Sequence, residues 1–369
     1  RLGGRQVAPL AGGYVVKTIV ELGGAEVQQR HRAALIDQHL VDVNVAGRTN
    51  FQTGLAGALL ALLAAFWGSS YLLIKLALAT IPPVTLIAIR VTIASLFLLA
   101  IMRLRSERLP RGARDWRLLF VQSLLNSSLA WLVLAWGQQY VPSGTAGVLN
   151  STSPLFVLLI GMVMALWSRL RGTAAGSGSA STPRKTIGVA LGLVGVVLVI
   201  GVDALRGIGQ QTLAQVAVLF GAFLYACAAL SGKRLAHLSS LTTACGTMLC
   251  AAATLLPLSL AVDHPWTLVP SATSLVAAVT LGILCTGVAL IIYFRLIKTL
   301  GAMGVASQSY LRAGVSVLLG FLVLGEQPPP SVLIGLVITI TGVALINWPA
   351  RPAPYDDRTT TAKTERATS

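Results

Sequence analysis

AMGVASQSYLRAGVSVLLGFLVLGE, residues 302–326, is the stretch that decides the fold. Most of its residues are apolar or small, and its length suits a helix that crosses a lipid bilayer. Arg312 stands near its midpoint, where an arginine costs about 2.5–3.5 kcal/mol on the mildest insertion scale. The polar residues just before it are Ser307, Gln308, Ser309 and Tyr310. We therefore expect Arg312 to line a solute path. The competing interpretation is a structural arginine held by backbone carbonyls between packed helices.

The composition places most of the chain in a membrane. Of its 369 residues, 55% are hydrophobic and 11% are charged, whereas a soluble protein carries about 25% charged residues. The net charge of +16 would suggest nucleic acid in a soluble protein. Here the Lys and Arg residues cluster between apolar segments, as they do in cytoplasmic loops of membrane proteins. We expect no nucleic-acid partner. No metal-ligand spacing of Cys and His is present, so we predict no metal and no cofactor.

Apolar segments recur along the chain from Leu55 onward, each near the roughly 20 residues that a spanning helix needs. They cover residues 55–79, 84–102, 117–138, 144–168, 186–203, 212–232, 240–262, 272–294, 302–325 and 331–348. Proline-containing turn signals separate several of them, such as Ile81-Pro82-Pro83 and Pro328-Pro329-Pro330. The pattern predicts an all-α integral membrane protein with ten transmembrane helices.

Loop charges predict the orientation. The loops on one side carry nearly all the basic residues: Arg103, Arg105, Arg108, Arg111, Arg114, Arg117, Arg169, Arg171, Arg184, Lys185, Lys233, Arg234, Arg295 and Lys298. The opposite loops contain only Arg206. Because basic loops stay in the cytoplasm, we expect a multi-pass protein of the cell (inner) membrane with both termini cytoplasmic. A purely orientational role is enough to explain these residues.

The chain also repeats itself. An offset of 158 residues brings Trp67 onto Tyr225, Asn150 onto Gln308 and Pro154 onto Arg312. Each unit then has five helices, and an odd number forces the second unit to insert upside down relative to the first. This predicts two inverted five-helix repeats, an architecture of many secondary transporters with the solute near mid-bilayer.

The repeat sets the expected boundaries. The first repeat covers residues 55–203 and includes a cytoplasmic Gly/Ser linker near 169–185, and the second covers 212–348. Residues 1–54 form a polar N-terminal extension without a motif, which we expect to be poorly ordered. Residues 349–369 are expected to form a disordered cytoplasmic tail.

Four segments carry a family likeness: WGSSYLLIKLAL (67–78), IPPVTLIAIR (81–90), SPLFVLL (153–159) and FLVLGE (321–326). In this order they resemble the EamA family of the drug/metabolite transporter superfamily, over about residues 55–348. The resemblance implies a ten-helix carrier that moves small metabolites, often amino acids or toxic compounds, outward by alternating access. The chain departs from the family pattern at Ser168, where the first half lacks the Glu that the second half has at Gly325-Glu326.

Pro154 lies in the middle of the fourth segment, behind Asn150 and a run of hydroxyl residues. A proline there frees the backbone carbonyl four residues earlier, that of Asn150, which nearby hydroxyls can bind. Since the repeat places Pro154 and Arg312 at equivalent depths, we expect them to form two halves of one central site. The alternative is a kink that only shapes the bundle.

Other candidates for the same site are polar or aromatic residues within apolar segments. Arg90 lies two turns inside its segment and either faces the cavity or extends outward to the interface. Gln122 and Asn126 share one helix face by spacing and either line the cavity or bond neighbouring helices. Trp67 and Tyr71 form either an aromatic wall or part of an interfacial belt.

These observations predict a secondary transporter that exports a small metabolite, an amino acid or a related compound. An electropositive cavity favours solutes with a carboxylate, and no Asp or Glu at a helix centre identifies a coupling ion. The alternative is a membrane-embedded enzyme acting on a lipid-linked substrate, but the four histidines all lie outside the helix centres. The expected partners are a small-molecule substrate and the lipid bilayer, and a homodimer is left open.

Overall fold

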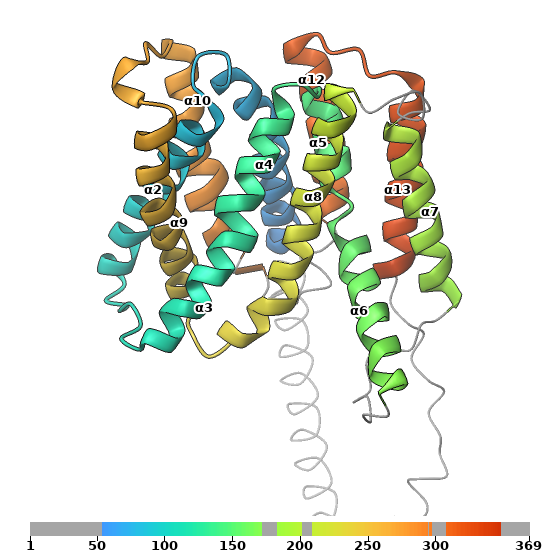
Figure 1. Ribbon diagram of the computed structural model, residues 1–369, viewed down its shortest axis with the longest axis horizontal. Coiled ribbons are helices and arrows are strands. Elements are labelled where there is room, and N and C mark those ends of the chain that lie inside the picture. Colours follow the sequence, from blue (N-terminus) through green and yellow to red (C-terminus); the bar gives the residue numbers. More distant parts are fainter. Residues whose placement is uncertain (1–53, 172–182, 201–208, 294, 297–307, 348–369) are drawn as a thin grey trace, which may run out of the picture. The chain divides into compact units, whose positions relative to one another are not determined.

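The computed structural model describes residues 54–171, 183–200, 209–293, 295–296 and 308–347 (Figure 1). The chain divides into two units, Arg1–Ala58 and Leu59–Ser369, and the account below concerns the second. The predictions for the N-terminal extension, most of the Gly/Ser linker and the tail lie outside the described residues. Every regular element in the described ranges is a helix.

The first half begins with the helix Gly54–Ala77. Its other helices are α2 (Pro83–Leu104), α3 (Ala113–Ser123), η1 (Leu124–Ser128), α4 (Leu129–Gln138), α5 (Ser143–Asn150), α6 (Ser153–Leu170) and α7 (Pro183–Ile200). The second half contains α8 (Gln210–Ser231), η3 (Gly232–Leu235), α9 (Ser240–Val262), η4 (Pro265–Thr267), α10 (Ala272–Gly282), η5 (Ile283–Val288), α12 (Gln308–Leu324) and α13 (Pro330–Asn347). Helices therefore occupy all the apolar segments identified in the sequence.

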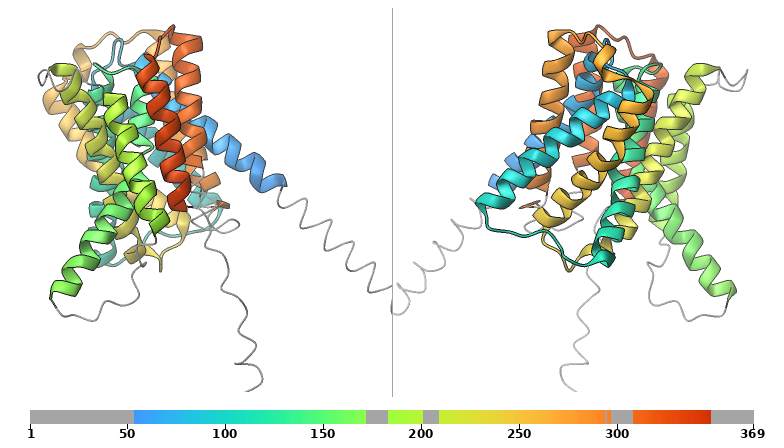
Figure 2. Two further views of the ribbon diagram at one scale, coloured as in Figure 1. Left: turned by 90° about the vertical axis from the view of Figure 1, so that its right-hand side faces the viewer. Right: turned by 60° about the vertical axis from the view of Figure 1, so that its left-hand side comes forward.

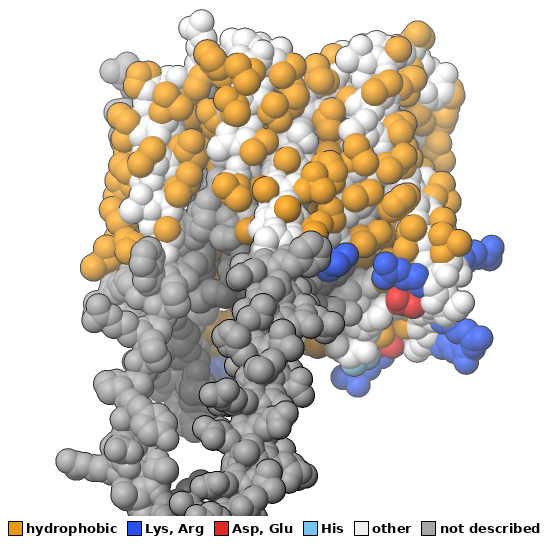
Figure 3. Space-filling model, turned by 180° about the vertical axis from the view of Figure 1, so that it is seen from behind, with side chains coloured by type: hydrophobic (Ala, Val, Ile, Leu, Met, Phe, Trp, Pro, Cys, Tyr) orange, Lys and Arg blue, Asp and Glu red, His pale blue; other side chains and the backbone are white. Residues whose placement is uncertain are grey.

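Seven helices of the described part are long and apolar enough to cross a membrane: Gly54–Ala77, Pro83–Leu104, Ala113–Gln138, Ser143–Ser168, Gln210–Leu235, Ser240–Val262 and Ala272–Tyr293. Shorter apolar helices cover Thr186–Ile200, Leu311–Leu324 and Pro330–Gly342. Large hydrophobic side chains remain exposed along them, for example Val163 at 65% and Val337 at 64%. Figure 3 shows hydrophobic side chains over one face, with Lys and Arg gathered at one end. Such a surface is suited to lipid and confirms the all-helical membrane class.

The closest helix pairs join one half to the other. α7 packs along α13, α2 along α9, and α5 against α12 (Figures 1 and 2). The backbones of α7 and α13 lie very close together. A β-carbon at Gly342 would collide with the backbone of Gly188 and Gly192. Small residues let helix backbones approach in lipid, where no hydrophobic effect drives them together.

Two of the long helices contain π-helical segments. η1 interrupts the helix Ala113–Gln138, and η5 interrupts the helix Ala272–Tyr293. A π-helical turn holds more residues than an α-helical turn and often marks a functional position. The prediction that Gln122 and Asn126 share one face assumed a regular α-helix, and η1 breaks that regularity between them.

Carboxylates from the second half cap helices of the first. Gly325, with a φ of 66°, turns the chain after α12, so that Glu326 reaches the N-terminus of α5. Its carboxylate accepts hydrogen bonds from the Ser143 amide (2.7 Å), the Ser143 hydroxyl (2.9 Å) and the Gly144 amide (3.1 Å). Asp263 accepts from the amide and hydroxyl of Thr85 near the start of α2. Both carboxylates satisfy otherwise unpaired N–H groups and the positive ends of helix dipoles.

Candidate solute-binding site

The site is built around the break between α5 and α6. Pro154 lies in the first turn of α6, and the residues before it turn their hydroxyls back onto α5. Ser151 donates to the Val148 carbonyl (2.6 Å), and Ser153 donates to the Asn150 carbonyl (2.9 Å). The expected kink, with hydroxyls binding the freed carbonyls, is confirmed. The break leaves Asn150 as the last residue of α5, buried within the bundle.

Asn150 connects three helices. The guanidinium Nη2 of Arg312, on α12, donates to the Asn150 carbonyl at 3.4 Å. The Asn150 side-chain amide donates to the Tyr71 hydroxyl at 2.6 Å. The Tyr71 carbonyl in turn accepts from the Gln138 side chain at 2.9 Å. The structure therefore brings together Arg312, Asn150 and Tyr71, which the sequence had predicted for one site.

Several buried polar atoms in this group have no hydrogen-bond partner. They are Nε of Arg312, Oδ1 of Asn150, and Oε1 of Gln308, whose amide nitrogen donates weakly to Ser309 at 3.3 Å. An unsatisfied buried polar atom costs about 1–3 kcal/mol. A donor and an acceptor left unsatisfied side by side indicate a place where a polar solute or water completes the hydrogen bonding.

Arg90 forms the second positive group of the site. Its side chain is only 4% exposed, so the interpretation in which it extends outward to the interface is wrong. Its Nε donates to the Thr286 hydroxyl at 2.9 Å, and the guanidinium carbon lies 3.8 Å from the centre of the Trp131 ring. The Thr286 hydroxyl donates to the Leu281 carbonyl (2.8 Å), so its oxygen is directed to accept from Arg90. No carboxylate among the described residues pairs with Arg90.

Tyr225 is a further polar side chain near the two arginines. Its hydroxyl is within electrostatic range of Tyr71, Arg90 and Arg312, and it lies beside Trp131. Sequence reasoning did not place Tyr225, Trp131 or Thr286 in the site. A signal was present for Tyr225, because the repeat pairs it with Trp67.

The other candidates are placed less centrally. The Trp67 ring contacts that of Tyr293, with centroids 5.3 Å apart. The Gln122 side-chain oxygen accepts from the Ser231 hydroxyl at 2.9 Å, the interhelical bond that was its alternative interpretation. Asn126 lies in η1, and no hydrogen bond or ion pair within the described residues joins it to Arg312. The side chain of Tyr310 lies outside the described residues.

Lys75 has a structural explanation. Its ammonium donates to the carbonyls of Gln138 (2.7 Å) and Val141 (3.3 Å), where α4 ends. A cation at a helix C-terminus is favourable because it meets the negative end of the helix dipole. Lys75 therefore closes the end of α4 and leaves Arg90 and Arg312 as the positive groups of the candidate site.

Comparison with known proteins identifies the family of this chain. The model of the EamA-like transporter family matches residues 55–168 and 212–348. A probable terminal-alkyne amino-acid exporter of Streptantibioticus cattleyicolor is 28% identical, over 76% of this chain and 89% of that protein. The uncharacterized inner membrane transporter YedA of Escherichia coli K12 is 28% identical, over 81% of this chain and 94% of that protein.

Two further comparisons agree. An uncharacterized transporter of Archaeoglobus fulgidus is 29% identical, over 78% of this chain and 95% of that protein. A crystal structure of another protein aligns with a TM-score of 0.55 and 19% identity. That alignment covers 79% of this chain and 96% of the other and concerns the fold alone. Because the family model matches most of its length, the chain belongs to the EamA-like transporter family, whose members are membrane proteins.

Proposed function

We propose that this transporter exports a small metabolite with a carboxylate or a related anionic group, such as an amino acid or a related compound. The observation that carries the proposal is a pair of arginines from opposite halves: Arg90 is buried without a carboxylate partner among the described residues, and Arg312 has an unsatisfied Nε. Buried charges are costly unless they are paired. An anionic solute would supply the carboxylate that no described residue offers to Arg90.

The unsatisfied atoms near Asn150 suggest how such a solute is held. Arg312 Nε is a free donor and Asn150 Oδ1 is a free acceptor in the same group of residues. A solute with both an anionic oxygen and an N–H group would satisfy both atoms. The weak 3.4 Å bond from Arg312 to the Asn150 carbonyl is easily exchanged for a bond to the solute.

The proposed architecture is ten transmembrane helices in two inverted five-helix repeats, 55–203 and 212–348. The offset of 158 residues supports it, because it moves η1 onto residues 282–286, which overlap η5. The separate stretches matched by the family model also agree with two units. Alternating access would then be a rocking of one unit against the other around Arg312 and Asn150.

The protein is proposed to lie in the inner membrane of the cell, with both termini in the cytoplasm. Figure 3 supports it, because the Lys and Arg side chains gather at one end of the described helices. In this orientation, Asp263 and Glu326 hold the outer ends of α2 and α5. An outward-open state requires those contacts to loosen.

A flux assay in sealed proteoliposomes tests the proposal. Amino acids, their amides and organic cations would be loaded with and without a proton gradient, beside an Arg312→Gln variant. Export of the carboxylate-bearing solutes, lost in the variant, would support the site. Equal export of acids and amides would show that the transporter does not recognise the carboxylate of its solute. A solute that emerges chemically changed would favour the alternative of a membrane-embedded enzyme, against which family membership now weighs.

A further inference from the structure

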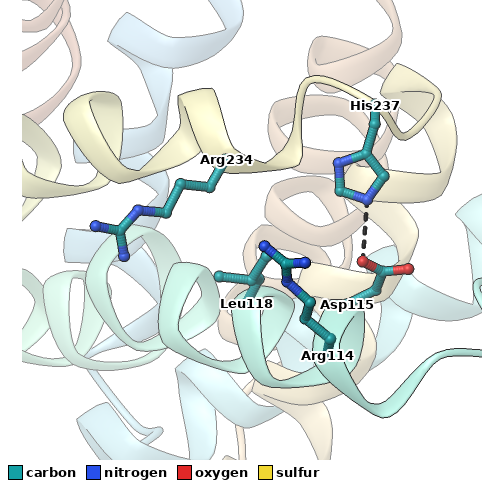
Figure 4. A pocket seen from close by; sticks show the side chains of 5 residues that line it. All are labelled: Arg114, Asp115, Leu118, Arg234 and His237. Carbon is teal, nitrogen blue, oxygen red and sulfur yellow. Dashed lines mark hydrogen bonds and ion pairs between the residues drawn. The ribbon is translucent and has the colours of Figure 1, made fainter.

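A hollow lined by residues of α3 and of the segment around η3 lies among the loop arginines (Figure 4). Its volume is about 520 Å³. α3 contributes Arg114, Asp115 and Leu118 from its first two turns, while η3 and the segment after it contribute Arg234 and His237. The hollow is thus built from both halves of the chain, and its size is within the range of ligand pockets.

Positive charge without a partner dominates this hollow. The carboxylate that lines it already has a partner, because Asp115 Oδ1 lies 3.0 Å from Nε2 of His237. Within the described residues, Arg114 and Arg234 form no hydrogen bond or ion pair. Figure 4 shows both arginine side chains on the same side of the Asp115–His237 contact. Two guanidinium groups in such a place match the oxygens of a phosphate, which arginine binds with paired N–H groups.

The surroundings place this hollow at the level of lipid headgroups. It lies where α3 begins, and further along α3 Phe120 and Val121, 43% and 46% exposed, line a separate hollow with Arg111 and Arg117. A hollow lined by basic residues, at the start of a helix that continues into exposed apolar residues, fits a molecule with a charged head and hydrocarbon chains. Basic pockets between helices on the cytoplasmic side of membrane proteins bind anionic lipid headgroups in this way.

We propose that this hollow binds the phosphate group of an anionic membrane phospholipid, with Arg114 and Arg234 as its donors. The site is separate from the transported solute and does not depend on the identity of that solute. Because α3 belongs to the first half and η3 to the second, a bound headgroup holds the inner ends of the two halves together. The Asp115–His237 contact already joins the same two segments.

The test uses the full chain in detergent micelles, titrated with phosphatidylglycerol, phosphatidylcholine or inorganic phosphate and followed by native mass spectrometry. We expect specific retention of phosphatidylglycerol. The double variant Arg114→Gln/Arg234→Gln should weaken it about tenfold or more, since each basic residue near an anionic surface contributes about a factor of five. A matched control, Arg103→Gln/Arg105→Gln, removes the same charge from exposed arginines of the same end and should leave retention unchanged.

Three outcomes would overturn the proposal. Equal weakening by the control variant would mean that binding is a diffuse effect of net charge. Equal retention of phosphatidylcholine would mean that the anionic charge of the headgroup is not recognised. Displacement of the lipid by inorganic phosphate at equal concentration would identify the ligand as a soluble phosphate compound. An unchanged melting temperature in pure detergent verifies that the variants are folded.

Discussion

Arg312 on α12 donates to the backbone carbonyl of Asn150, the last residue of α5, across a distance of 3.4 Å. The contact joins a side chain of the second half to a carbonyl that is available because Pro154 breaks the first half's helix. In a continuous α-helix, that carbonyl would accept the amide of residue 154. The proline therefore leaves this carbonyl available to Arg312, so the hydrogen bond of Arg312 depends on the proline at position 154.

Replacing Pro154 with Ala should weaken transport without weakening the fold. Alanine supplies an N–H that competes with Arg312 for the Asn150 carbonyl, and because the first turn of a helix accommodates either residue, the fold should not weaken. We expect a lower initial transport rate in proteoliposomes and an equal or higher melting temperature. Pro257→Ala is the control, because Pro257 lies inside α9 with an exposed side chain. Equal rates for both variants and the unmodified protein would contradict the dependence.

Thr286 should position Arg90 for the solute. Thr286→Val keeps the shape but removes the acceptor of the 2.9 Å bond from Arg90 Nε, a bond to a charged group worth about 1.5–3 kcal/mol. We expect the apparent KM for carboxylate-bearing solutes to rise about tenfold or more, with little change in the maximal rate. Thr286→Ser, which keeps the hydroxyl, should restore the KM.

The repeat supplies a matched control for Thr286. The offset of 158 residues relates Thr286 to Ser128 in η1, and Arg90 to Met248, so Ser128 has no arginine to hold. Ser128→Ala should therefore leave the KM unchanged. A KM that rose equally in both variants would show that the π-helical geometry matters, and that the bond to Arg90 does not.

Glu326 should keep the outer end of α5 in place. Glu326→Gln removes the charge that meets three donors at the start of α5, an interaction of about 1–2 kcal/mol. We expect a lower melting temperature and easier labelling of a cysteine introduced at the buried Val141, two residues before α5, by an impermeant reagent added outside. Gln327→Glu leaves the native cap intact and serves as the comparison. Unaltered labelling in Glu326→Gln would show that the carboxylate does not hold this end closed.

The sequence was sufficient for the helices, the kink at Pro154 and the proximity of Arg312 to Asn150, whereas it left two interpretations of Tyr71 open. The helices follow from hydropathy, the kink from the chemistry of proline, and the proximity of Arg312 to Asn150 from the internal sequence repeat. It was insufficient for Arg90, whose direction depends on Trp131 and Thr286 from two other helices. It also failed to foresee η1 and η5, because π-helical turns arise from packing and leave no periodic signal in an apolar segment.

The close contact between α7 and α13 should make the stability of the fold sensitive to substitution of Gly342. A β-carbon at Gly342 would lie 2.6 Å from the carbonyl oxygen of Gly188 and 2.6 Å from the amide nitrogen of Gly192. Backbone atoms cannot rotate away, so Gly342→Ala must separate the helices and should cost about 1–3 kcal/mol. Gly161→Ala, where no atom lies within 4 Å of the new carbon, should be neutral or slightly stabilising. Thermal unfolding in detergent measures both variants. Equal melting temperatures for the two would mean that α7 and α13 are not held by backbone proximity, and that their glycines serve another purpose.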